Sequence, residues 1–226
     1  MYFREISTVL FDLDWTLVRN PFREYILPEI YDRVHARYEY TKDEFTELLD
    51  RLFHKCLLGS INRSKPATWA DLDLIFEEFG VDVSLLRFFQ KYQSEIKLYP
   101  DVLPALDRLV DRFRLGVLTN GFKVLVDLEF DQTKIAHYFE KIFIADDIGY
   151  AKPDPRLFTY VLKEMRVRAN NVLYVGDTAD IDVPGAKEIG ITTIIVNRSG
   201  KPIPHEMKPT IEIKTLRELL DHLTKT

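Results

Sequence analysis

Two aspartates that stand two residues apart, Asp12 and Asp14, are the first side chains whose types and spacing could do chemistry. They follow Thr8–Phe11, an apolar and β-favouring stretch that predicts a fully buried strand. Residues two apart on a strand point the same way, so both carboxyl groups should face one small volume. Two negative charges at such a short distance require a cation between them, or one of the two carboxyl groups must keep its proton. Because such a pair alone is more often an acidic loop after a core strand, other residues must decide whether it is a site.

Further polar residues stand at the ends of later strand-like segments. They are Thr119 and Asn120 after residues 115–118, Lys152 after 142–145, and Asp177, Asp180 and Asp182 after 172–175. Taken singly, each is explained by a turn, a helix cap or a surface lysine. In parallel α/β sheets, however, ligands bind beyond the carboxyl ends of the strands. The arrival of all these groups in order at strand ends therefore predicts one common site.

The segments that position these residues alternate between strands and helices. Strands are predicted over residues 8–13, 115–118, 142–145, 172–175 and 192–196, and helices over 101–112, 124–135, 154–165, 184–189 and 216–223. Short apolar strands that alternate with helices form a parallel sheet with both faces covered. The sequence thus predicts an α/β fold, a Rossmann-like parallel sheet sandwiched by helices.

Residues 19–96 interrupt this alternation, because they carry helical patterns and no strand signal. Thr41 and Glu44 form a capping-box pattern that predicts the start of one helix. Apolar residues such as Phe45, Leu49 and Phe53 then recur on one face of that helix. We therefore expect two domains: a discontinuous α/β core of residues 1–18 and 97–226, and an inserted all-helical cap of residues 19–96.

Composition excludes several kinds of partner. A net charge of −5 argues against a nucleic-acid partner, which requires a basic face. No apolar run approaches the roughly 18 residues of a membrane span, and no signal-like segment opens the chain. The lone Cys56 excludes an intrachain disulfide and fits a reducing compartment. We expect a cytoplasmic monomer or homodimer, with a charge-rich, Gln-poor composition of the thermophile type.

The motifs together resemble the haloacid dehalogenase superfamily, specifically its phosphatase branch. The resemblance covers residues 6–18 and 97–198, and the helical insertion stands at the usual position of the family's cap. The matching residues are Asp12, Asp14 and Thr16 (D-x-D-x-T); Thr119 in L-T-N-G; Lys152-Pro153; and Gly176-Asp177-Thr178 with Asp182 and Gly185-Ala186. Trp15 departs from the commoner small or polar residue, and the spacing to Gly185-Ala186 favours Asp182 over Asp180 as the second acid of the last motif.

The resemblance implies a Mg²⁺-dependent phosphomonoester hydrolase that acts on a small phosphorylated substrate. Asp12 would attack phosphorus to form an aspartyl-phosphate, and Asp14 would act as general acid and then as general base. The implied phosphate-binding residues are Thr119, Asn120 and Lys152, and the implied metal ligands are Asp12, Asp177 and, through its backbone carbonyl, Asp14. Thr16 and Asp182 would lie behind these groups, with Asp182 paired to Lys152.

Two other functions stay open from the sequence. A 2-haloacid dehalogenase has the same fold and nucleophile and needs no metal, although the resemblance implies that such enzymes lack the acid that stands here as Asp14. A receiver-like signalling domain accepts phosphate on an aspartate without being an enzyme, but it lacks a helical insertion of this size. The sequence does not identify the substrate. Polar residues of the insertion that could contact it are Arg19, Arg23, Arg33, Arg51, His54, Asn62, Arg63 and Lys65.

Overall fold

A six-stranded parallel sheet forms the centre of the protein. The structure is a computed structural model, and it describes residues 3, 5–35, 38–63, 65–77, 79 and 83–224. The strands lie in the order β5 (Lys141–Ile144), β4 (Arg114–Thr119), β1 (Thr8–Phe11), β6 (Val172–Gly176), β7 (Thr192–Val196) and β8 (Ile211–Ile213). Every neighbouring pair of strands is parallel. The predicted parallel α/β fold is therefore confirmed.

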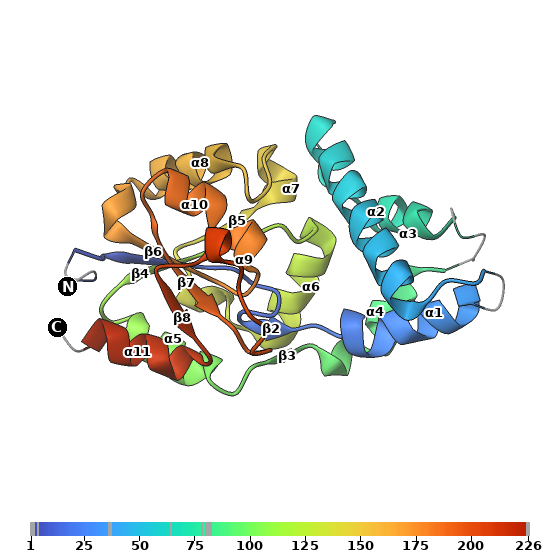
Figure 1. The fold of residues 1–226 in the computed structure, drawn as a ribbon, viewed down its shortest axis with the longest axis horizontal. Coiled ribbons are helices and arrows are strands. Elements are labelled where there is room, and N and C mark those ends of the chain that lie inside the picture. The colour runs from blue at the N-terminus through green and yellow to red at the C-terminus, as the bar shows by residue number, and fades with distance from the viewer. Residues whose placement is uncertain are drawn as a thin grey trace.

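Helices cover both faces of the sheet (Figure 1). One face carries α8 (Pro155–Met165) and α10 (Pro184–Glu188), and the other carries α5 (Val102–Leu109) and α11 (Leu216–Thr224). The alternation of side chains along β1 divides the core accordingly. Leu10 packs in the same cluster as Val161 of α8, whereas Val9 packs in the same cluster as Leu219 of α11. Burial on both faces explains why the strand reads as a continuous apolar run.

Three shorter or outlying helices complete the core. They are α6 (Lys123–Thr133), α7 (Ala145–Ile148) and α9 (Ala179–Asp182). Each begins just beyond the carboxyl end of a strand, so all three lie near the edge of the sheet where the predicted site residues stand.

The inserted residues are helical, as expected, and lie beside the sheet on the right of Figure 1. A π-helical segment, Phe22–Ile26, leads into α1 (Leu27–His35), α2 (Lys42–Asn62), α3 (Trp69–Glu77) and α4 (Leu85–Lys91). The capping box opens α2: the Thr41 hydroxyl accepts from the Glu44 N–H at 3.3 Å, and Glu44 accepts from the Thr41 N–H at 2.8 Å. Among the described residues, no helix combines the length and apolar character needed to cross a membrane.

Several short elements differ from the sequence-based expectations. A two-stranded antiparallel ribbon, β2 (Val18–Arg19) with β3 (Lys97–Leu98), joins the insertion to the core, so residue 19 is extended rather than helical. Ala145 begins α7 instead of ending β5, and β8 adds an unexpected edge strand. These elements have two to four residues and no clear periodicity, so pairing with neighbours, rather than their own sequence, determines them.

Candidate active site

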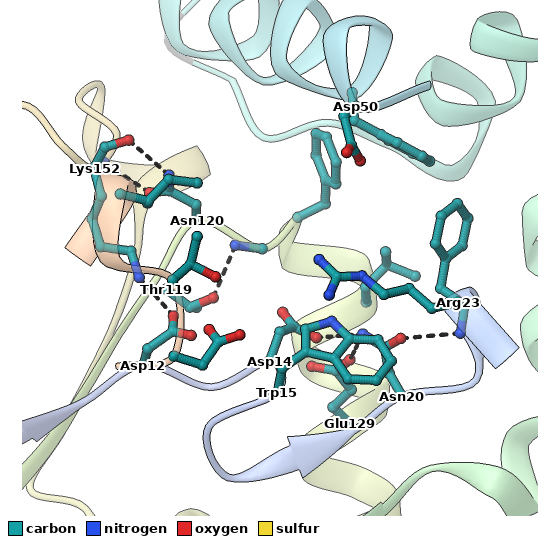
Figure 2. Close-up of a pocket in the computed structure, with 18 of the residues that line it drawn as sticks. Asp12, Asp14, Trp15, Asn20, Arg23, Asp50, Thr119, Asn120, Glu129 and Lys152 are labelled. Carbon is teal, nitrogen blue, oxygen red and sulfur yellow. Dashed lines mark hydrogen bonds and ion pairs between the residues drawn. The ribbon is translucent and has the colours of Figure 1, made fainter. Parts of the chain in front are cut away.

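The predicted site residues meet at the carboxyl ends of the three central strands. Because β1 lies between β4 and β6, Asp12 after β1 stands between Thr119 at the end of β4 and Asp177 after β6. The backbone N–H of Asp12 still donates to Val175 O at 2.8 Å, which extends the pairing of β1 with β6 and fixes the position of Asp12. Figure 2 shows Asp12 and Thr119 close together in this site, with Lys152 beside them.

Lys152 lies at the floor of this site and is 3% exposed. Its ammonium group donates to Asp12 Oδ1 and Asp182 Oδ1, both at 2.7 Å, and to the Tyr174 hydroxyl at 2.8 Å. Burial alone would lower the pKa of Lys152, but the negative charges of Asp12 and Asp182 outweigh it and raise that pKa. Lys152 therefore stays positively charged and joins Asp12, which follows β1, to Asp182 at the end of α9.

Asp12 is a buried acid that directly follows β1, a central strand of the sheet. Its Oδ1 accepts from Lys152, and its Oδ2 accepts from the Thr16 hydroxyl at 3.3 Å. Burial raises the pKa of Asp12 well above its ordinary value; Lys152 opposes this shift, and Asp182 and Asp177 reinforce it. The Asp12 carboxylate is thus a poorly solvated charge that a further cation would stabilise.

Three acids form a cluster that could hold a metal ion: carboxylate oxygens of Asp12, Asp177 and Asp182 lie within 4.8 Å of one another. Both oxygens of Asp182 have partners, because Oδ1 accepts from Lys152 and Tyr174 and Oδ2 accepts from the Thr178 N–H at 2.9 Å. Asp182 thus accepts three hydrogen bonds, whereas Asp12 accepts one on each oxygen, so Asp12 and Asp177 are better placed than Asp182 to offer a lone pair to a cation. Hard carboxylate oxygens fit Mg²⁺.

The electrostatics of Asp177 also fit a cation. Burial and then the charge of Asp182 raise the pKa of Asp177 from 3.8 to about 6, so the cluster without a cation holds more negative charge than it can solvate. A glycine at position 176 makes this crowding possible. A Cβ on Gly176 would lie 2.2 Å from Asp182 Oδ2, so any other residue would push Asp182 away from β6.

Asp14 and Thr119 face the same small space on the other side of Asp12. A Cβ built on Gly121 would lie 3.2 Å from Thr119 Oγ1 and 3.4 Å from Asp14 Oδ2, so both groups converge above this glycine. The Thr119 hydroxyl accepts from the Gly121 N–H at 2.9 Å, and Asp14 Oδ1 accepts from the amide of Asn20. The second oxygen of Asp14 is thus directed towards the cavity.

Asn120 uses its side chain to position Lys152. Its amide donates to Lys152 O at 2.9 Å and accepts from the Lys152 N–H at 2.8 Å. This pair of bonds ties the end of β4 to the loop that carries Lys152 (Figure 2). A phosphate contact by Asn120 would use its backbone N–H or the second hydrogen of its amide nitrogen.

A cavity of about 300 Å³ opens over these groups and is lined from both sides. It brings together Asp12, Asp14, Thr119, Asn120, Lys152, Asp177 and Asp182; Thr16, fully buried, lies behind Asp12. The inserted segment contributes Asn20, Phe22, Arg23, Asp50, Phe53 and Phe89. Of the eight polar residues of the insertion proposed from the sequence, Arg23 alone is among the described lining residues. Its guanidinium lies 4.8 Å from the centre of the Trp15 ring.

The sequence interpretation missed four groups in the site. Tyr174 was read only as part of an apolar strand, and Asp50 as part of an amphipathic helix. Asn20 falls in the segment 19–96 that carries helical patterns, and nothing in the sequence indicates that its side chain contacts Asp14 and the buried Glu129. Burial raises the pKa of Glu129 well above its ordinary value, and Asp14 reinforces this shift. A carboxyl group within the otherwise ordinary helix α6 gave no signal, since its burial depends on how α6 packs.

The fold and the site define the class of protein. A family model for haloacid dehalogenase-like hydrolases matches residues 6–190, so the chain belongs to this family of enzymes. The chain is similar to glyceraldehyde 3-phosphate phosphatase of Methanopyrus kandleri, with 28% identity over 228 residues that cover 96% of each chain. It is also similar to (S)-2-haloacid dehalogenase 4A of Burkholderia cepacia, with 29% identity over 62% of this chain and 60% of that protein. The crystal structure of a HAD phosphatase from Thermococcus onnurineus superimposes with a TM-score of 0.72 and 30% identity, over 96% of this chain and 98% of that one. A receiver-type signalling domain is therefore no longer an alternative.

Proposed function

We propose that this enzyme is a Mg²⁺-dependent phosphomonoester hydrolase that cleaves a small phosphorylated metabolite through an aspartyl-phosphate on Asp12. Asp12 and Asp177 would hold the metal ion, with the backbone carbonyl of Asp14 as a third protein ligand. When bound, the ion would neutralise charge on the transferring phosphate and on the acids around it.

The residues of this chain supply the remaining steps. An oxygen of the Asp12 carboxylate would attack phosphorus, and the bond from phosphorus to the leaving oxygen would break. Asp14 would give its proton to that oxygen and then take one from the water that hydrolyses the aspartyl-phosphate. Thr119 and the backbone N–H of Asn120 would bind the phosphate oxygens, and Lys152, whose three N–H groups bind Asp12, Tyr174 and Asp182, would attract the phosphate by its positive charge. Thr16 and Asp182 would orient Asp12 and Lys152.

The position of Asp14 is the observation that carries this proposal. Its Oδ2 faces the cavity beside Thr119, and Asp12 lines the same cavity. An alkoxide is a poor leaving group and benefits from a proton donor, whereas a halide leaves without one. A second carboxyl at this place is therefore expected for a phosphatase and serves no purpose in halide displacement.

We also propose that residues 19–96 act as a cap over a core of residues 1–18 and 97–226. The cavity has walls from both parts, and the two-residue strands β2 and β3 are the connections between them. Bending at this ribbon would open and close the cavity, so that water is excluded while phosphate is transferred. Substrate choice would then depend on the cap side chains Phe22, Arg23, Asp50, Phe53 and Phe89.

The test is phosphate release from a panel of phosphorylated metabolites, with metal-free enzyme before and after addition of Mg²⁺. Glyceraldehyde 3-phosphate belongs in the panel because a relative over the whole chain is named for its hydrolysis. We expect no turnover in EDTA, recovery with Mg²⁺, and no turnover by Asp12→Asn under either condition. Undiminished hydrolysis in EDTA would contradict the role given to Asp177.

Hydrolysis of 2-haloacids is the second candidate, because a relative over part of the chain carries that name. The same preparations should be assayed for halide release without metal. If the enzyme released halide and left every phosphate ester intact, the dehalogenase function would replace the phosphatase. We expect the reverse.

A further inference from the structure

Asn20 engages both ends of its side-chain amide with buried or partly buried groups. The amide nitrogen donates to Asp14 Oδ1 and, at 3.2 Å, to Glu129 Oε1, and the amide oxygen accepts from the Phe22 N–H at 3.0 Å. Asn20 is 9% exposed and Glu129 is 1% exposed, so water competes little for these bonds. The proposed mechanism gives neither residue a role.

The surroundings of Asn20 leave only one orientation for its amide. A backbone N–H can only donate, so the amide oxygen must face Phe22, and the nitrogen must then face the two carboxyl groups. Figure 2 shows this arrangement beneath Trp15. One oxygen of Asp14 is thereby held from the side, and the other is left directed at the cavity above Gly121.

Packing does not explain Glu129. Its Oε2 is buried and accepts from no N–H or O–H of the described residues, although the Glu129 carboxyl also lies within hydrogen-bond reach of the Asp14 carboxyl, which raises the pKa of Glu129. A buried polar atom without a hydrogen-bond donor destabilises a fold, so an apolar residue at this position of α6 would give a more stable protein. What the carboxyl group provides is the acceptor that, together with the Phe22 N–H, fixes the amide of Asn20.

We propose that Asn20 and Glu129 are positioning residues for Asp14, and this inference rests on the proposed role of Asp14 as proton donor. Glu129 holds the amide of Asn20, and Asn20 holds the Asp14 carboxyl in the orientation that meets the leaving oxygen. Asn20 also binds the N–H of Phe22, in the first turn of the cap. A movement of the cap at this point is therefore transmitted to the carboxyl group of Asp14.

The test compares two esters that differ in their need for a proton donor. p-Nitrophenolate leaves without protonation, whereas an alkoxide requires it. Loss of the hydrogen bond that orients the Asp14 carboxyl should lower kcat/KM for an alkyl phosphate by about 10- to 100-fold in Asn20→Leu. For p-nitrophenyl phosphate, kcat/KM should fall by less than about threefold, because protonation of the leaving group contributes little to that transfer. Hydrolysis of the aspartyl-phosphate, which also uses Asp14 and is common to both esters, follows departure of the leaving group and does not enter kcat/KM. The matched control is Gln132→Leu, which removes an exposed amide from α6.

Variants of Glu129 separate positioning from packing. Glu129→Gln keeps an oxygen that accepts from Asn20 and should stay within about threefold of the wild type, whereas Glu129→Leu should show the same dependence on the leaving group as Asn20→Leu. If Asn20→Leu does not fold, Asn20→Ser keeps a short acceptor for the Phe22 N–H and gives the same comparison.

Combination with Asp14→Asn completes the test. With no proton donor left to position, Asn20→Leu should cause no additional loss in that background. Equal losses of kcat/KM on both esters, or an additive loss on top of Asp14→Asn, would overturn the positioning role. A wild-type enzyme that hydrolyses neither ester would contradict the proposed function instead, so the two failures are distinguishable.

Discussion

Stabilisation of the protein by Mg²⁺ should increase with pH through about 6, because Asp177 must lose its proton to bind the ion. The pKa of Asp177 is raised from 3.8 to about 6, mainly by burial and then by the charge of Asp182. In the metal-free protein, this raised pKa adds stability at low pH, and that stability is lost as the pH rises through about 6. The stabilisation by Mg²⁺ has the opposite pH dependence, because Mg²⁺ binds the ionised carboxylate of Asp177.

The size of the effect follows from the linkage of binding to folding. At a Mg²⁺ concentration one hundred times the Kd at pH 7.5, binding stabilises the folded state by about 2.7 kcal/mol. At pH 5, about one unit below the pKa of Asp177, protonation weakens the apparent affinity about tenfold and leaves about 1.4 kcal/mol. For a chain of this length, these free energies raise Tm by about 5–10 °C and by about 3–5 °C, respectively. The raised pKa of Asp12 acts in the same direction and lowers the second figure further.

The assay is thermal unfolding with and without Mg²⁺ at both pH values, and it needs no substrate. Asp177→Asn should lose the Mg²⁺-dependent rise in Tm at either pH. Asp180→Asn removes the same charge from an exposed position three residues later and should keep the full rise. An equal rise at pH 5 and pH 7.5, or a full rise in Asp177→Asn, would refute the assignment of Asp177 as a ligand.

Two further substitutions test the neighbouring groups. Asp14→Asn keeps the size of the side chain and the backbone carbonyl but removes proton transfer, so kcat for an alkyl phosphate should fall by about 10²–10⁴-fold. The Mg²⁺-dependent rise in Tm should remain, and loss of that rise would show that the substitution disturbs the metal site. Lys152→Met leaves Asp12 and Asp182 buried without their cation, so the free energy of unfolding at pH 7.5, measured in urea, should fall by about 3–5 kcal/mol. A loss below about 1 kcal/mol would contradict the structural importance of this ion pair, and Lys187→Met, at an exposed position, is the control.

The central part of the site could be predicted because local sequence and topology rules determine it together. Apolar runs predict the strands, and parallel strands place their carboxyl ends at one edge of the sheet. Asp12, Thr119 and Asp177 needed no more information than that to be assigned to one place. Lys152 lies on a loop after the predicted strand 142–145, which also assigned it to this edge, whereas its pairing with Asp182 followed only from the resemblance to the family.

The contacts that depend on helix packing could not be predicted. Asn20 and Glu129 are separated by 109 positions, and their contact requires that α6 turn one particular face towards the start of the insertion. The same holds for the cap side of the cavity. Phe53, expected only on the apolar face of a helix, lines the cavity, whereas the polar candidates Arg33 and Arg63 instead pair with acids at the surface. The left-handed backbone of Trp15, with φ of +61°, is another feature that residue type would not predict.

The balance of charge in the site links its stability to its proposed activity. Asp12, Asp177 and Asp182 stand around one lysine, so the cluster holds three carboxyl groups against a single ammonium group. Full ionisation would leave two negative charges in a poorly solvated place, and the raised pKa values of Asp12 and Asp177 are the response of the metal-free protein. One divalent cation would offset both charges and return Asp12 to the ionised form that a nucleophile requires. The repulsion among these carboxylates that destabilises the metal-free fold is thus the same interaction that would favour binding of the metal ion. The bound ion would in turn keep Asp12 ionised.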